Sequence, residues 1–131
     1  MTSTTPPARI DAERLWADIE ALAARTEPDR PYTRRAFTEV YLEGRRWLAA
    51  RMREAGLETH VDAGGNLIGR WEGTDPGLPP LMVGSHTDTV VNGGRFDGVV
   101  GVLGARSSTS SPKNPPTTGL PAWAARRWRA A

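Results

Sequence analysis

The residues of this chain best suited to chemistry lie in one short, glycine-rich segment, residues 84–98. It holds His86, Asp88 two residues later and Asp97 nine residues after that. Imidazole and carboxylate groups are the ligands through which a protein without cysteine can hold zinc and similar divalent ions. A carboxylate near the second ring nitrogen of a histidine also fixes its tautomer and raises its basicity as a ligand. The segment therefore predicts half of a metal site.

Two apolar runs must position these side chains. Residues 81–83 lead into the segment and predict a buried strand, covered on both faces, that ends at Ser85. Residues 99–103 lead out of it and predict a helix that starts near Gly98. We expect this helix to be short, with the apolar side chains of Val99, Val102 and Leu103 left without partners.

Asp97, at the start of this helix, has two compatible interpretations. Its carboxylate can stabilise the helix N-terminus, and it can also bind a metal. The only other histidine, His60, lies on the polar face of an alternating strand and is expected to be solvated. Arg34 and Arg35 are expected on solvated helix faces. The tryptophan and tyrosine residues fall on helical apolar stripes and are expected in the core.

The remaining elements predict an α/β fold. A helix is expected over residues 10–25, with Asp11 as its N-cap, and a second one from Thr38 to Ala55. Alternating residues 57–62, a Gly-Gly-Asn turn and residues 67–72 predict a hairpin of two strands. Helices before and after a group of strands indicate an α/β sandwich with a central sheet.

Composition changes near Arg106. All 15 acidic and 12 of the 17 basic residues precede it, so the first 105 residues carry a formal charge of −3, whereas the tail carries five positive charges. We predict a disordered N-terminus at 1–9, a folded domain with the half metal site at 10–105 and an unrelated, disordered basic tail at 106–131. Arginine, alanine, serine and proline are typical of a G+C-rich gene read out of frame, so a frameshift is our hypothesis for the tail.

The chain also gives indications of its compartment. It has no cysteine and no run of about 18 apolar residues, which argues against disulfides and a membrane span. Its first residues are polar, which argues against a secretory signal. We therefore expect a cytoplasmic protein without a membrane partner.

Residues 84–98 resemble the metal-binding motif of the zinc-dependent aminoacylase and carboxypeptidase superfamily. Within it, the chain is similar to the branch of N-carbamoyl-L-amino-acid hydrolases and allantoate amidohydrolases. Residues 11–16, 52–57 and 62–70 support that branch. The resemblance covers about residues 10–105 and implies that they form a partial catalytic, metal-binding domain. Because members are much longer, the chain resembles an amino-terminal fragment, with a truncated α/β sandwich and a central mixed sheet.

This resemblance implies hydrolysis of non-peptide C–N bonds in small amide or ureido compounds, such as N-carbamoyl amino acids or allantoate. It implies two divalent ions, zinc first, with manganese, cobalt or nickel as alternatives. His86 would be a terminal ligand, Asp97 would bridge the two ions, and Asp88 would belong to the catalytic set by orienting His86. Arg95 is a candidate for substrate binding, or else pairs with a carboxylate or faces solvent. Intact relatives are expected to be homodimers.

Two limits follow. The family places its general base and further ligands later in the chain, but no Asp, Glu or His follows Asp97 here, so we expect this chain to be inactive alone. The alternative is a non-enzymatic protein that binds nucleic acid, or another partner, through the basic tail with its two tryptophans. Nucleic-acid binding is disfavoured because the tail has no recognisable binding fold.

Overall fold

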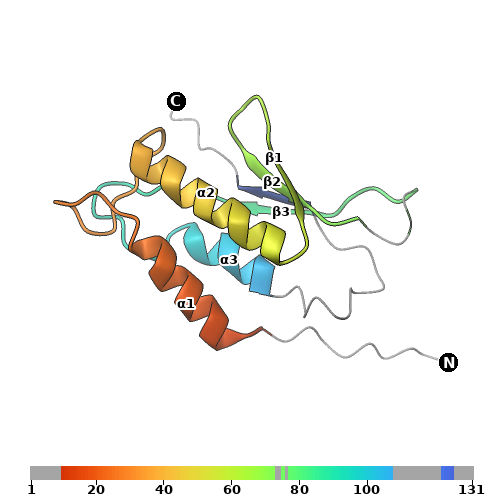
Figure 1. The fold of residues 1–131 in the computed structure, drawn as a ribbon, viewed down its shortest axis with the longest axis horizontal. Coiled ribbons are helices and arrows are strands. Elements are labelled where there is room, and N and C mark those ends of the chain that lie inside the picture. The colour runs from red at the N-terminus through yellow and green to blue at the C-terminus, as the bar shows by residue number, and fades with distance from the viewer. Residues whose placement is uncertain (1–9, 73–74, 76, 108–121, 126–131) are drawn as a thin grey trace.

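The structure is a computed structural model, and it describes residues 10–72, 75, 77–107 and 122–125 (Figure 1). Helices α1 (Ala12–Ala23) and α2 (Glu39–Glu54) begin where the sequence predicts. The side chains of Asp11 and Thr38 each accept a hydrogen bond from the main-chain N–H three residues further on, so both predicted N-caps are confirmed.

The N-cap of α2 gives a testable contribution to stability. Thr38 Oγ1 accepts from the main-chain nitrogen of Tyr41 at 3.2 Å. Replacing Thr38 with alanine should lower the free energy of unfolding by about 1 kcal/mol, because that N–H loses its partner. Urea unfolding measures the change, with Thr38→Ser as the matched variant that keeps the oxygen. Equal stability of the two variants would contradict this assignment.

Within the described residues, four strands form one mixed sheet, three of which the sequence predicts. They are β1 (Glu58–Val61), β2 (Leu67–Arg70), β3 (Met82–Ser85) and β4 (Ala122–Ala125), in the spatial order β1-β2-β4-β3. The first two form the predicted antiparallel hairpin. Strand β4 is antiparallel to β2 and parallel to β3.

Strand β4 differs from the expectation for the tail. We predicted disorder after Arg106, but residues 122–125 form a strand between β2 and β3. Pairing there depends on main-chain donors and acceptors, which alanine supplies as well as any residue, so side-chain periodicity does not reveal it. Residues 1–9, 108–121 and 126–131, where we also predicted disorder, lie outside the described residues.

The helices and the sheet share one core. Helix α2 packs on β1 and β2, while α3 (Val99–Ser107) packs on α1 and β3 (Figure 1). The buried apolar residues of this core come from all three helices and the hairpin: Ile19, Leu22, Leu48, Ala49, Met52, Leu57, Leu67, Val99, Val102 and Leu103.

This core corrects two expectations. The apolar face of α3 does not lack partners, because Val99, Val102 and Leu103 are buried in the shared core. Strand β3 is not covered on both faces, since the side chain of Met82 is 58% exposed. Helix α3 packs against β3, on one face of the sheet.

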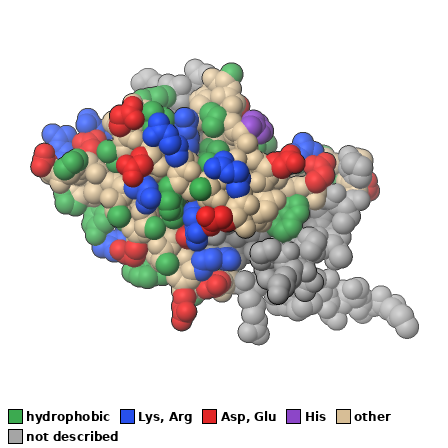
Figure 2. Space-filling view, in the orientation of Figure 1, with side chains coloured by type: hydrophobic (Ala, Val, Ile, Leu, Met, Phe, Trp, Pro, Cys, Tyr) green, Lys and Arg blue, Asp and Glu red, His purple; other side chains and the backbone are tan. Residues whose placement is uncertain are grey.

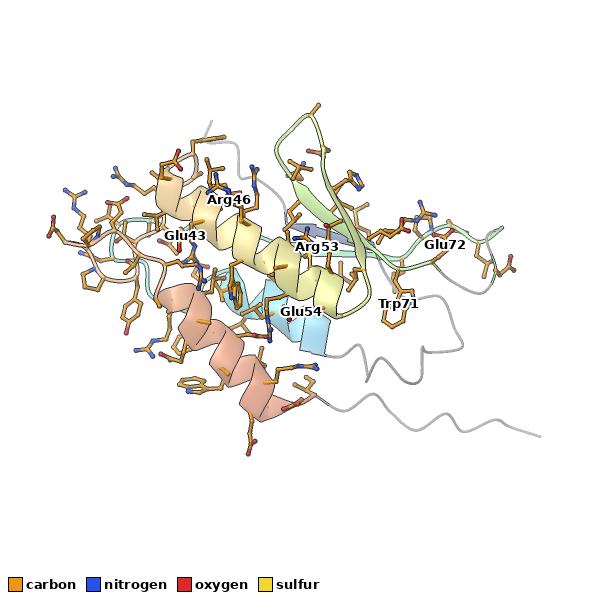
Figure 3. All side chains as sticks on the ribbon, in the orientation of Figure 1. Glu43, Arg46, Arg53, Glu54, Trp71 and Glu72 are labelled. Carbon is orange, nitrogen blue, oxygen red and sulfur yellow. The ribbon has the colours of Figure 1, made fainter. Side chains whose placement is uncertain are left out.

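The surface of the helical layer is polar and mixed in charge. Glu43, Arg46, Arg53 and Glu54, labelled in Figure 3, are exposed residues of α2. On the face shown in Figure 2, basic and acidic groups are interspersed. Trp16 was predicted to lie in the core, but it is exposed. Its ring centre lies 6.1 Å from that of Phe96. Within the described part of the chain, no helix is long and apolar enough to cross a membrane.

Candidate metal centre

The loop between β3 and α3 brings the predicted site residues together. His86 follows the last residue of β3, and Asp97 stands two residues before α3 begins. Gly98 makes their approach possible: its φ of 66° is left-handed, and a Cβ built there would lie 2.3 Å from the carbonyl oxygen of His86. Only a residue without a side chain allows the start of α3 to lie this close to His86.

The imidazole of His86 contacts both aspartates. Its Nδ1 lies 3.0 Å from the main-chain oxygen of Asp88 and 3.6 Å from that residue's Oδ1. Its Nε2 lies 3.6 Å from Oδ1 of Asp97, whose side chain is 61% exposed. A carbonyl oxygen only accepts hydrogen bonds, so the shorter contact requires the hydrogen on Nδ1. In the neutral ring this leaves the lone pair on Nε2, on the side of Asp97.

This geometry differs in detail from the arrangement that the sequence suggests. The group at hydrogen-bond distance from Nδ1 is the main chain of Asp88, and the carboxylate is further away. Either oxygen favours the same tautomer, so the expected orientation of His86 does not depend on which one accepts.

The pair can be tested against the needs of a metal ion. Nitrogen and oxygen ligands lie about 2 Å from zinc, so two donor atoms 3.6 Å apart can both reach one ion. Among the residues that the structure describes, however, no group of three or more His, Cys, Asp or Glu side chains is arranged so that it could hold a metal ion. The described residues therefore fit two positions of a metal site and do not complete a catalytic one.

Arg95 is engaged within the molecule. Its Nη1 contacts the carboxylate of Glu20 on α1, and its Nη2 donates to the hydroxyl oxygen of Tyr32 at 2.6 Å. The guanidinium also lies 4.7 Å from the centre of the Tyr32 ring. Of the roles considered for Arg95, pairing with a carboxylate is the one that these contacts match.

The sequence does not indicate that Arg34 binds the loop between β3 and α3. Arg34 was expected on a solvated face, but its side chain is buried, whereas Arg35 is exposed and pairs with Glu27. Arg34 donates through Nε to the carbonyl oxygen of Thr87 at 2.9 Å. Burial lowers the pKa of Arg34 to about 10, opposed by the charge of Asp88, so the side chain stays positive at neutral pH. A paired-arginine motif gives no sign of which member is buried.

Known proteins match most of the chain. An N-carbamoyl-L-amino acid amidohydrolase from Geobacillus stearothermophilus is 47% identical over 95 residues, which are 72% of this chain and 23% of that protein. Allantoate amidohydrolase from Escherichia coli is 43% identical over 79 residues, 60% of this chain and 19% of that one. A hydantoinase/carbamoylase family amidase from Burkholderia ambifaria superposes with a TM-score of 0.81 at 34% identity, over 92% of this chain and 30% of that structure. No protein-family model matches.

The mixed sheet, the three helices and this superposition define the fold as that of the α/β amidases. More particularly, the chain belongs to the hydantoinase/carbamoylase family, in the branch of the N-carbamoyl-L-amino-acid and allantoate amidohydrolases. It spans less than a quarter of the length of these two curated relatives.

Proposed function

We propose that this chain supplies His86 and Asp97 as two ligands of a divalent-metal site in a hydrolase of non-peptide C–N bonds. The observation that carries the proposal is the pair itself, with Nε2 of His86 3.6 Å from Oδ1 of Asp97. The membership of the chain in a family of amidohydrolases supports the reaction class.

The residues around the pair have separable tasks. The main-chain oxygen of Asp88 holds the hydrogen on Nδ1 of His86 and so keeps the Nε2 lone pair available. Asp97 adds a negatively charged oxygen ligand, and as a carboxylate it can bridge two ions. When bound, a divalent ion polarises a carbonyl group and makes a nucleophile from water at neutral pH. Zinc is the first candidate, and manganese, cobalt and nickel also suit these ligands.

The substrates proposed are small ureido or amide compounds. N-carbamoyl-L-amino acids and allantoate are the candidates, because matched relatives are named for them. The cytoplasm is the proposed compartment and a homodimer the proposed state of the intact enzyme.

This chain by itself is proposed to be inactive. A catalytic zinc ion usually has three protein ligands, and this site offers two. The sequence contains no Asp, Glu or His after Asp97 that could add a ligand or a general base. Hydrolysis would then need side chains that another polypeptide segment provides.

Cobalt(II) tests the two-ligand site without any assay of activity. At millimolar cobalt, paramagnetic broadening of NMR signals should be strongest at His86 and Asp97 and should weaken in both His86→Ala and Asp97→Ala. His60, the other histidine, is exposed on β1 and serves as the control within the same molecule. Broadening centred on His60, or unchanged in both variants, would contradict the proposal.

A further inference from the structure

Arg34 is a buried cation whose side chain joins two parts of the fold. Its residue is 3% exposed. Its Nε donates to the carbonyl oxygen of Thr87, next to His86, at 2.9 Å. Its Nη1 donates to the carbonyl oxygens of Leu22 and Arg25, at the end of α1, at 2.8 and 3.0 Å. One guanidinium thus connects the loop after β3 to α1.

The main chain of Arg34 and of the two residues before it also binds the loop after β3. Its N–H donates to Oγ1 of Thr89 at 2.8 Å, and its carbonyl oxygen accepts from the main-chain nitrogen of Thr89 at 2.9 Å. Oγ1 of Thr89 in turn donates to the carbonyl oxygen of Tyr32, and the N–H of Asn92 donates to Oγ1 of Thr33. Residues 32–34 are therefore hydrogen-bonded to the part of the loop that follows Asp88 in sequence.

Helix α2 packs closely against the stem of Arg34. A Cβ built at Gly44 would lie 3.0 Å from Cδ of Arg34, so a side chain at this position would force the stem to shift by a few tenths of an ångström. The planar guanidinium offers five fixed N–H donors, which a lysine ammonium cannot reproduce from one point. Carbonyl groups from two separate segments are thus satisfied by a single side chain.

We propose that Arg34 is a positioning residue for His86. By holding the carbonyl of Thr87, it fixes the turn in which Asp88 accepts from Nδ1 of His86 and the Nε2 lone pair faces Asp97. The proposal rests on the proposed role of His86 as a metal ligand, but the geometry that it explains exists without a metal.

The test is the tautomer of His86 in metal-free protein, read from ¹⁵N chemical shifts of the ring at a pH where both histidines are neutral. Arg34→Lys keeps the positive charge but loses the planar guanidinium with its fixed N–H donors. In this variant we expect the Nε2–H fraction of His86 to rise at least about twofold, because the hydrogen bond that selects the tautomer loosens. His60 should not change, and Arg35→Lys, on the exposed neighbour, should leave both histidines as in the parent.

A second variant and a measurement on the unsubstituted protein keep the proposal testable if Arg34→Lys does not fold. Gly44→Ala retains the guanidinium but displaces its stem, and should shift the His86 tautomer in the same direction by less. In the parent protein, the Nε–H of Arg34 should exchange with water at least about tenfold more slowly than that of Arg35. An unchanged His86 tautomer in either folded variant would overturn the proposal, as would equal exchange at the two arginines. Because no metal is present, these outcomes are independent of whether His86 binds one.

Discussion

Replacing Gly98 with alanine should destabilise the chain by about 4 kcal/mol or more, an exceptional loss for a single methyl group. The new Cβ would lie 2.3 Å from the carbonyl oxygen of His86 and 2.6 Å from Nδ1 and Cε1 of its ring. The nearest of these atoms belongs to the main chain and cannot swing aside, so either α3 or the end of β3 must move. Urea unfolding gives the loss of stability, and the NMR signals of the His86 ring report its displacement from Asp97.

Gly94 provides the matched control. Its φ of 89° is also left-handed, but a Cβ built there has no neighbour within 4 Å. Gly94→Ala should therefore cost only the backbone strain, about 1–2 kcal/mol. If the two variants lose the same stability, then strain alone explains Gly98, and the close approach of α3 to His86 is not what requires a glycine.

The sequence predicts well the features that neighbouring residues determine. Asp11 and Thr38 cap their helices through main-chain groups three residues away, so a short window contains the whole interaction. The hairpin of β1 and β2 follows from alternation around a Gly-Gly-Asn turn. The pairing of His86 with both aspartates likewise lies within one loop.

The features that sequence missed depend on distant parts of the chain. Arg34 is buried because its partners include Thr87, 53 residues away, and nothing near Arg34 in sequence indicates that contact. The apolar side chains of α3 are covered because α1, from the start of the chain, packs on them. Strand β4 inserts between β2 and β3 through main-chain hydrogen bonds, which leave no apolar pattern.

The second large effect concerns catalysis. We expect no measurable hydrolysis of N-carbamoyl amino acids or allantoate by this chain, with zinc or manganese added. The lack of a general base alone is worth roughly 100- to 10,000-fold in rate. In calorimetric titrations, the parent chain should bind zinc more tightly than His86→Ala by only a small factor, because two protein ligands leave most positions of the ion to water.

Ammonia release from N-carbamoyl amino acids and from allantoate is the measurement that tests the account most directly. It compares the parent chain with His86→Ala and Asp97→Ala at equal protein and metal concentrations. The two-ligand account predicts that all three proteins give the background rate of the buffer with metal. Turnover by the parent chain that disappears in both variants would contradict it, because the described half-site would then be completed by side chains already present in this protein or in a second copy of it.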